Sequence, residues 1–196
     1  MANVVLFHHV LGLTEGMLTL AGHWRAAGHD VMTPDLFEGE RFTTIDDGVA
    51  HLESIGFPAL IERGEAAVSG LAPGVVFAGV SMGVICAQQL AQTRSDAAGA
   101  VLMESCLPPS EFGEAWPDAV PVQIHGMSED PFFAGEGDID NARAIVASSP
   151  APLTGLFVYP GDRHLFVDSS VAAHDPAAAT LVIERTLEFL AGIDAR

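Results

Sequence analysis

A serine between two glycines is the first feature of this chain that could do chemistry. The stretch from Phe77 to Ile85 is FAGVSMGVI, in which Gly79, Ser81 and Gly83 separate an apolar run from a helical one. At a sharp strand-to-helix turn, flanking glycines let neighbouring backbone approach, and the serine Oγ is exposed at the start of the helix. The motif is short and is also compatible with an ordinary turn that has a capping serine. Other residues must decide between these two interpretations.

A serine hydroxyl is a poor nucleophile unless a base accepts its proton. Three histidines follow Ser81 in the sequence: His125, His164 and His174. His125 lies within the apolar run VPVQIHG and is expected in the core or at a strand end, and His174 precedes the last helical segment as a surface or capping residue. His164 lies in YPGDRHLF, a loop directly after the last strand-like run. We therefore predict that His164 is the base.

The carboxylate that orients the base is expected between the serine and the histidine, which is the chain order of α/β-hydrolases. The segment HGMSEDPFF offers Glu129 and Asp130 at the end of a strand-like run. Asp130 is the better candidate because Pro131 stiffens the chain beside it, and a short carboxylate on a stiff loop can hold an imidazole in one tautomer. We interpret Glu129 as a solvated loop charge.

An oxyanion formed at the serine needs backbone N–H donors. Met82, which follows the serine, supplies one, and the loop after the first strand supplies the other from Val10 or Leu11. His8 and His9 precede this loop and would point to opposite faces of a strand, so they could not bind one metal together. We expect one of them at the floor of the pocket and the other in the core.

The charge of the chain excludes several function classes. The 196 residues carry a formal net charge of −18, and all eight basic residues are arginines. Such a chain is repelled by phosphate backbones and anionic membranes, so we expect neither a nucleic-acid nor a membrane partner. Because lysine is absent, a Schiff-base enzyme, a P-loop lysine and a Ser–Lys dyad are excluded.

The first residues and the cysteines indicate the compartment. The segment MANVVLFHHV has no basic region and no cleavage site of a signal peptide, and no apolar run approaches the ~18 residues of a membrane span. Cys86 and Cys106 are too few for a disulfide framework, and Cys86 lies in an apolar helical segment as a buried thiol. We expect a cytoplasmic protein.

Strand-like and helix-like segments alternate along the chain. The strand-like segments are nearly continuous apolar runs, which is typical of parallel strands covered on both faces. With no linker or repeat, residues 1–196 are predicted to form one α/β domain, a doubly wound, mostly parallel sheet of about six strands with helices on both faces. Working residues then gather at the carboxyl ends of the strands. The predicted strands are 3–10, 29–35, 74–80, 99–105, 120–126 and 154–160, and the predicted helices are 14–28 (N-cap Thr14), 45–56, 59–71, 84–94, 138–148 and 175–192.

The chain resembles the dienelactone hydrolase family of α/β-hydrolases over nearly its whole length. The resemblance depends on FHHVLGLTEGM, AAGHDVMTPDLFEG, GVSMGV, HGMSEDPFF, PGDRHLFVDSS and ERTLEFL. It implies that Ser81, Asp130 and His164 form the family's catalytic triad. It also implies that the backbone amides of Val10 and Met82 form the oxyanion hole.

Three positions depart from the family pattern that the resemblance implies. Ser81 replaces a cysteine nucleophile, and His9 replaces a glutamate that belongs to the thiol-activating device. Asp168 replaces an arginine that would bind a substrate carboxylate, which leaves Arg41 and Arg163 as the remaining candidates for that role. The resemblance also implies a hairpin before the first parallel strand, whereas the given sequence begins with the residues expected to form that strand. These departures make dienelactone itself a doubtful substrate but leave ester hydrolysis intact.

The sequence therefore predicts a serine hydrolase that cleaves small-molecule carboxylic esters or lactones through an acyl-enzyme, without a cofactor or metal, as a monomer or homodimer. Neutral substrates are expected to be preferred over carboxylates. A hydrolase-like receptor with little turnover and an acyltransferase are the alternatives. The candidate pocket walls are Leu11, Phe37, Phe112, Trp116, Phe132, Leu165 and Phe166, each of which could equally pack in the core.

Overall fold

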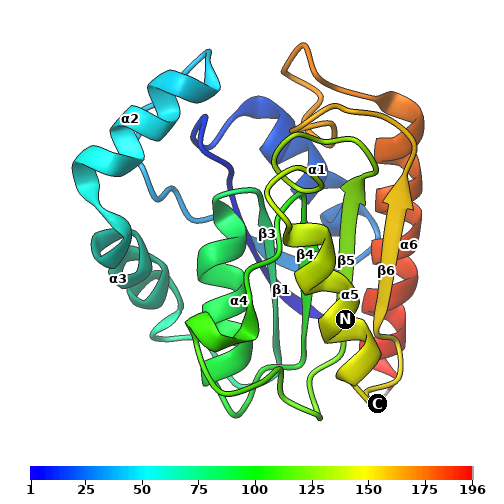
Figure 1. Cartoon of the computed structure of the whole chain (residues 1–196). Helices are drawn as coiled ribbons and strands as arrows, with labels where there is room; N and C mark the ends of the chain where they lie inside the picture. The colour runs from blue at the N-terminus through cyan, green and yellow to red at the C-terminus, as the bar shows by residue number, and fades with distance from the viewer. Residues whose placement is uncertain (196) are drawn as a thin grey trace.

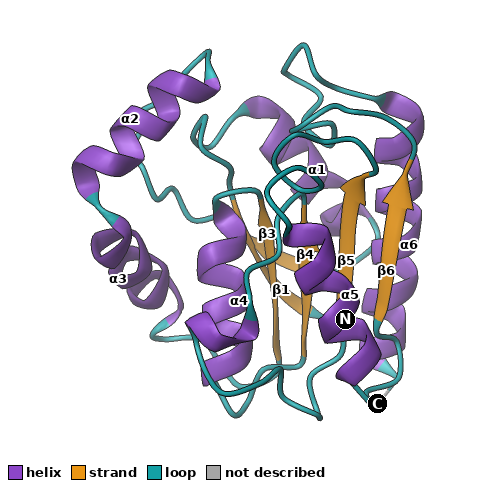
Figure 2. Ribbon diagram, in the orientation of Figure 1, coloured by secondary structure: helices purple, strands orange, loops and turns teal. Residues whose placement is uncertain are grey.

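Six strands of the chain lie side by side in a parallel sheet with the order β2-β1-β3-β4-β5-β6 (Figures 1 and 2). The structure, a computed structural model, describes residues 1–195. Every neighbouring pair of strands is parallel, which confirms the predicted α/β sheet. The strands are β1 (Asn3–Phe7), β2 (Asp30–Met32), β3 (Val75–Val80), β4 (Gly99–Met103), β5 (Val122–Met127) and β6 (Gly155–Tyr159).

Helices cover both faces of the sheet (Figure 1). The helices α1 and α6 pack against each other on one face, whereas α4 and α5 cover the other. Beyond α4, α3 packs against α4 and α2 packs against α3. Across residues 1–195, none of the helices combines the length and the apolarity that crossing a membrane requires. The helices are α1 (Glu15–Ala26), α2 (Ile45–Ile55), α3 (Phe57–Val68), α4 (Gly83–Thr93), α5 (Asp138–Ser148) and α6 (Pro176–Asp194), with a short 3-10 turn η1 (Pro109–Glu111).

Local chemistry sets the helix and strand ends. Thr14 caps α1 as predicted, since its hydroxyl accepts a hydrogen bond from the Met17 amide at 3.2 Å. The first strand is shorter than predicted because the chain turns after Phe7, and His8 and His9 lie in this turn. The expectation that these two histidines occupy opposite faces of a strand is therefore wrong.

The position of a strand in the sheet explains its burial. Every residue of β3, β4 and β5 is buried because helices cover both faces of these central strands. The edge strands are less covered, and they expose Met32 on β2 and Val158 on β6. The continuous apolar runs in the sequence thus correspond to the interior of the sheet.

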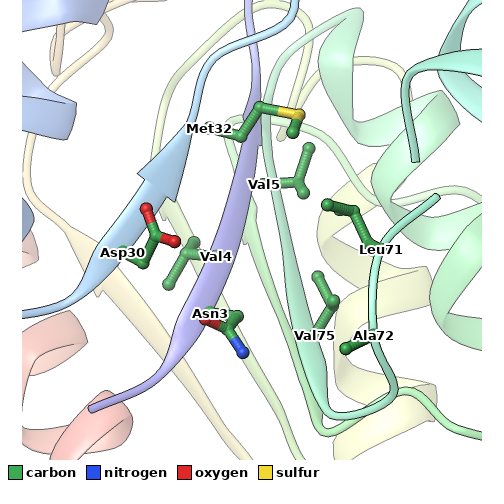
Figure 3. Close-up of a pocket in the computed structure, with 8 residues that line it drawn as sticks. All are labelled: Asn3, Val4, Val5, Asp30, Met32, Leu71, Ala72 and Val75. Carbon is green, nitrogen blue, oxygen red and sulfur yellow. The ribbon is translucent and has the colours of Figure 1, made fainter.

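A shallow hollow lies at the amino-terminal side of the sheet, where β1, β2 and the start of β3 meet residues 71–72 (Figure 3). Its volume is about 250 Å³, and apolar side chains such as Val5 and Leu71 line it together with Asn3 and Asp30. No serine, histidine or cysteine is among these lining residues. The hollow therefore offers neither a nucleophile nor a base, and the chemistry must be sought at the opposite ends of the strands.

Candidate active site

Ser81 occupies the sharp turn between β3 and α4. Its φ is +50°, in the left-handed region that residues with a Cβ rarely adopt. Its N–H donates to the Met103 carbonyl at 2.8 Å, so the β3–β4 pairing continues one residue past the strand and fixes the strained turn.

Gly79 and Gly83 make this turn sterically accessible. A Cβ on Gly79 would lie 2.3 Å from the Gly83 carbonyl oxygen, and a Cβ on Gly83 would lie 2.3 Å from the Phe7 carbonyl oxygen. Both distances are far below van der Waals contact. The two glycines are therefore required by backbone that crowds the turn, in agreement with the sequence argument.

A chain of hydrogen bonds joins the three residues that the sequence singled out. The Ser81 Oγ lies 2.8 Å from the His164 Nε2, and the His164 Nδ1 lies 2.8 Å from an Asp130 carboxylate oxygen. Because the carboxylate can only accept, Nδ1 carries a proton and Nε2 is free to accept the serine proton. The three side chains follow the carboxyl ends of β3, β5 and β6. In the sheet, β5 and β6 are neighbours, and β4 lies between β3 and β5.

Asp130 is fixed more firmly than a loop carboxylate in water. It is fully buried, and its second oxygen accepts hydrogen bonds from the amides of Phe132 at 2.9 Å and Phe133 at 3.3 Å. The Phe132 ring lies against the His164 ring, with 4.5 Å between their centroids. Both the acid and the imidazole are thus held in one orientation.

The surroundings of His164 favour its protonated form. Burial alone disfavours the imidazolium, but the hydrogen bond to Asp130 and the charges of Glu104, Asp130 and Glu136 outweigh burial and raise the pKa of His164. The neutral imidazole that can accept a proton therefore dominates only above the usual histidine range, which lies near ~6.5.

The two amides predicted to hold an oxyanion are unoccupied. Neither the Val10 N–H nor the Met82 N–H donates a hydrogen bond to another atom of residues 1–195. Met82 begins the turn into α4, and Val10 follows β1, whose last residue, Phe7, is touched by the start of α4 at Gly83. Two free donors thus come from adjacent segments near the serine.

Ser81 and His164 open into a cavity of about 280 Å³ at the carboxyl edge of the sheet. Three carboxylates, those of Glu104, Glu136 and Asp138, contribute to its wall, and among its lining residues only His164 can carry a positive charge. The wall consists of Phe57, Ser81, Met82, Ile85, Glu104, Ser105, Leu107, Phe132, Glu136, Asp138 and His164.

The model of the dienelactone hydrolase family matches residues 1–193 of the chain. The chain belongs to the dienelactone hydrolase family. It is thus a member of a hydrolase family with the α/β-hydrolase fold, which confirms the resemblance drawn from the sequence. No curated protein is similar enough in sequence to be matched to this family member.

Solved structures share the fold at low sequence identity. A dienelactone hydrolase-like promiscuous phosphotriesterase, P91, from metagenomic libraries has a TM-score of 0.74 and 15% identity, covering 98% of this chain and 87% of its own. Alpha/beta hydrolase domain-containing protein 10 from mouse has a TM-score of 0.69 and 12% identity, with 97% and 90% covered. Esterase 2 from Thermogutta terrifontis has a TM-score of 0.61 and 18% identity, with 98% and 83% covered.

Two of the departures from the dienelactone hydrolase pattern touch each other in this family member. The His9 Nε2 lies 2.7 Å from an Asp168 carboxylate oxygen, and both side chains are fully buried. Where the resemblance implies a glutamate and an arginine, this chain therefore has a histidine and an aspartate in contact. An imidazole bonded to a carboxylate thus stands where the resemblance implies a carboxylate and a guanidinium.

Asp168 forms a closed polar cluster with groups next to the loop after β1. Thr14 donates to the oxygen that faces His9, and the Ser170 N–H and hydroxyl donate to the other oxygen at 2.7 and 2.6 Å. Burial alone would raise the pKa of Asp168, but the bonds from His9, Ser170 and Thr14 outweigh burial and hold this pKa well below the usual range. Asp168 is not among the cavity-lining residues, so its position presents no cation to the cavity.

Neither His8 nor His9 is at the floor of the cavity, so that expectation is wrong. The His8 Nδ1 donates to the His9 carbonyl at 2.7 Å, and its Nε2 accepts from the Leu36 amide at 2.9 Å. Burial lowers the pKa of His8 to about 4. The His9 Nδ1 accepts from the Leu11 amide at 3.2 Å. Both rings are satisfied core groups that fix the loop after β1.

Phe166 and four other residues predicted as cavity walls pack in the core. The ring of Phe37 packs against His8 at a centroid distance of 5.1 Å, and the Trp116 Nε1 donates to the Val120 carbonyl at 2.7 Å. These side chains serve the core, as the alternative interpretation allowed. The four are Leu11, Phe37, Trp116 and Leu165, all buried and outside the cavity wall.

Phe132 lines the cavity as predicted, and Phe112 lines an apolar groove beside it, whereas Phe166 is a buried core residue. Arg41 and Arg163 point elsewhere. Arg41 pairs with Glu15 at 3.1 Å, and the Arg163 guanidinium donates to a backbone carbonyl at 2.7 Å. Neither arginine is among the lining residues.

The remaining histidines and cysteines lie outside the cavity wall. His125 bonds to the Tyr159 hydroxyl at 2.9 Å in the core, and burial lowers its pKa to about 3. His174 bonds to a backbone carbonyl at 3.0 Å. Cys86 and Cys106 are buried free thiols, and burial raises the pKa of Cys86 to about 12. Within residues 1–195, no group of three or more metal-ligating side chains is arranged around a common point.

Sequence reasoning missed several cavity residues. Glu104 follows the buried strand β4 directly, and a carboxylate at the end of a buried strand is a signal that could have revealed it. Phe57, Ile85 and Leu107 come from α3, α4 and the loop after β4. Their shared position depends on how α3 packs against α4, which no local pattern in the sequence specifies.

Proposed function

We propose that this protein is a serine hydrolase that cleaves carboxylic esters or lactones through an acyl-enzyme. The observation that carries the proposal is the continuous chain of hydrogen bonds from Ser81 through His164 to Asp130, which begins at a strained turn and opens into a cavity. A serine cap without catalytic function would need neither the base nor the acid behind it.

In the first half of the proposed reaction, the Ser81 Oγ attacks the carbonyl carbon of the ester while the His164 Nε2 accepts the hydroxyl proton. Asp130 stabilises the imidazolium through the bond to Nδ1. The carbonyl oxygen becomes an oxyanion that the Val10 and Met82 amides bind. The C–O bond to the leaving alcohol then breaks, and the imidazolium returns its proton to the alkoxide.

The second half of the reaction repeats these steps with water. His164 takes a proton from water, whose oxygen attacks the acyl carbon bonded to Ser81. The oxyanion forms again in the same place. When it collapses, the acid is released and the proton returns to the Ser81 oxygen, so that the free enzyme is restored without a cofactor.

An apolar groove beside the cavity supports a preference for neutral esters with an apolar arm. The groove has a volume of about 240 Å³ and shares Phe57, Ile85 and Leu107 with the cavity wall. Ile61 and Phe112 extend it between α3 and the η1 segment. The acidic cavity wall and the groove together disfavour a substrate carboxylate and favour an alkyl or aryl group.

A series of p-nitrophenyl esters from acetate to octanoate, together with simple lactones, tests the proposal. We expect hydrolysis of the neutral esters that is abolished in Ser81→Ala. An added alcohol acceptor distinguishes hydrolysis from acyl transfer, and we expect water to remain the main acceptor. If no ester or lactone in the series is cleaved, or if Ser81→Ala retains most of the activity, the proposed function is wrong.

A further inference from the structure

Glu104 is a buried carboxylate beside the proposed base that the reaction described above does not use. It follows β4 directly, its side chain is fully buried, and its φ is +64°. Its N–H donates to the His125 carbonyl at 2.7 Å, which continues the β4–β5 pairing. The backbone of Glu104 is therefore fixed by the sheet in a conformation that residues with a Cβ rarely adopt.

The Glu104 carboxylate bridges two amides of the loop that carries the base. One oxygen accepts from the Leu165 N–H at 2.6 Å, and the other accepts from the Val167 N–H at 3.2 Å. Leu165, the residue directly after His164, has a φ of +66°. Two acceptor oxygens are matched here to two donors. The two hydrogen bonds hold the loop backbone in this rarely adopted conformation.

We propose that Glu104 is a positioning residue for the base, whose carboxylate fastens the turn after His164 to the end of β4 so that the imidazole faces Ser81. The inference rests on the proposed function for its effect on catalysis. It assigns a role to a carboxylate that would otherwise be a costly buried charge in the cavity wall.

A glutamine at position 104 would break this match. An amide side chain keeps one acceptor oxygen but presents an N–H₂ donor to the second loop amide, so one of the two bonds is lost. Since misplacement of a catalytic group by about 1 Å can cost about 100-fold in rate, we expect Glu104→Gln to lower kcat/KM by about 10- to 100-fold.

Glu104 also bears on the charge of His164. Burial raises the pKa of Glu104 to about 7, and the charges that act on this carboxyl are those of His164 and Asp130. The carboxylates that raise the pKa of His164 are Asp130, Glu104 and Glu136, while Asp138 also lines the cavity wall. Removing the charge of Glu104 therefore lowers the pKa of His164, and the rise of kcat/KM with pH moves to lower pH.

The experiment combines NMR with a pH–rate profile of the full-length protein. In the wild type, the amide proton shifts of Leu165 and Val167 should titrate together with the Glu104 carboxyl carbon near neutral pH. In Glu104→Gln, this titration should disappear, the His164 ring signals should move, and the midpoint of kcat/KM should fall. A merely structural glutamate would lower the rate without moving the midpoint.

Two further variants separate the contact between Glu104 and the loop amides from the effect of nearby negative charge on the pKa of His164. Glu136→Gln removes a carboxylate that raises the pKa of His164 but bonds to neither loop amide, so the Leu165 and Val167 signals should still titrate. Glu188→Gln removes an exposed charge on α6 and should match the wild type. Wild-type amide shifts that ignore the Glu104 carboxyl, or a Glu104→Gln variant with wild-type kcat/KM and midpoint, would overturn the inference.

The wild-type titration decides the contact even if Glu104→Gln fails to fold. The NMR titration needs no turnover, so its outcome is independent of the proposed reaction. Absence of ester hydrolysis by the wild type overturns the proposed function, whereas unresponsive Leu165 and Val167 amides overturn the role of Glu104.

Discussion

Two buried histidine–aspartate pairs lie near the ends of the strands, and they differ in what the second imidazole nitrogen meets. In the open pair, His164 and Asp130, the nitrogen that does not face the carboxylate meets the Ser81 hydroxyl at 2.8 Å. In the closed pair, His9 and Asp168, that nitrogen accepts from the Leu11 amide. The carboxylate distances, 2.8 and 2.7 Å, are nearly equal.

This difference separates a base from a structural tie. The imidazole of the open pair has a proton acceptor directed at a hydroxyl in the cavity. The imidazole of the closed pair has both nitrogens occupied, and its aspartate is saturated by Thr14 and Ser170. A histidine–aspartate pair is therefore no sign of catalysis by itself, because a nucleophile and access to substrate must complete it.

The largest expected effect belongs to the open pair. We expect Ser81→Ala and His164→Ala each to lower kcat by about 10⁴- to 10⁶-fold, with a double variant little worse than either, because such residues act as a unit. His9→Ala should lower the stability of the protein but should lower kcat much less than His164→Ala does. Steady-state kinetics with a chromogenic ester and thermal unfolding measure both. If His9→Ala lost as much activity as His164→Ala in a folded protein, the comparison would fail.

Breaking the closed pair should cost stability. Asp168→Ala leaves the buried donors of His9 and Thr14 without an acceptor, and each such group costs about 1–3 kcal/mol. We therefore expect the free energy of unfolding to fall by roughly 3 kcal/mol or more. Denaturant unfolding measures this, with Asp118→Ala on the exposed surface as the matched control.

The stability of the protein at low pH should depend on the same His9–Asp168 pair. The pKa of Asp168 is lowered in the folded protein, so its contribution to stability is full above the usual aspartate pKa and is lost as the pH falls below it. The wild type should lose this part of its stability toward acid, and Asp168→Ala should lack that loss. Equal acid sensitivity of the two proteins would show that Asp168 is no structural tie.

The loop after β1, which contains Val10, can be disturbed by a substitution in α2. A Cβ on Gly48 of α2 would lie 2.2 Å from the Val10 carbonyl oxygen, whereas a Cβ on Gly22 of α1 would meet nothing within 4 Å. We expect Gly48→Ala to shift the Val10 amide and lower kcat by up to about 10²- to 10³-fold, as for the loss of one oxyanion donor. Gly22→Ala should match the wild type. Equal kinetics of the two variants would argue against an oxyanion role for Val10.

The smallest expected effect concerns substrate charge. Asp168, where the resemblance implies an arginine, is buried outside the cavity wall, and Glu104, Glu136 and Asp138 make that wall acidic. Of two substrates that differ only by methyl esterification of a remote carboxylate, the neutral one should have the higher kcat/KM, by about tenfold at low salt. A preference for the free acid that disappears in Arg41→Ala or Arg163→Ala would contradict this.

The sequence predicted the central features of the fold and of the open pair. The glycines around Ser81, the loop position of His164 and the stiff turn at Pro131 are local signals, and the continuous apolar runs indicate parallel strands. The closed pair could not be predicted in the same way. His9 and Asp168 are 159 residues apart in the chain, and no local pattern indicates that they meet.

The cavity walls were predicted least well for a related reason. Apolar side chains such as Phe37 and Trp116 have the same signature in a core as in a pocket. Which of them face substrate depends on how the α2–α3 segment packs beside α4, which is a property of the tertiary structure. Glu104 was not predicted, although a carboxylate directly after a buried strand is a local signal that the sequence contains.

A covalent label on the nucleophile tests the central claim most directly. Diethyl p-nitrophenyl phosphate releases p-nitrophenolate when a serine attacks its phosphorus, which leaves a diethylphosphoryl group on the serine oxygen. We predict that mass spectrometry after peptide digestion finds the diethylphosphoryl group on Ser81, that ester hydrolysis is lost in step with labelling, and that Ser81→Ala takes up no label. A label on another residue that abolishes activity, or full activity after Ser81 is labelled, would contradict the account.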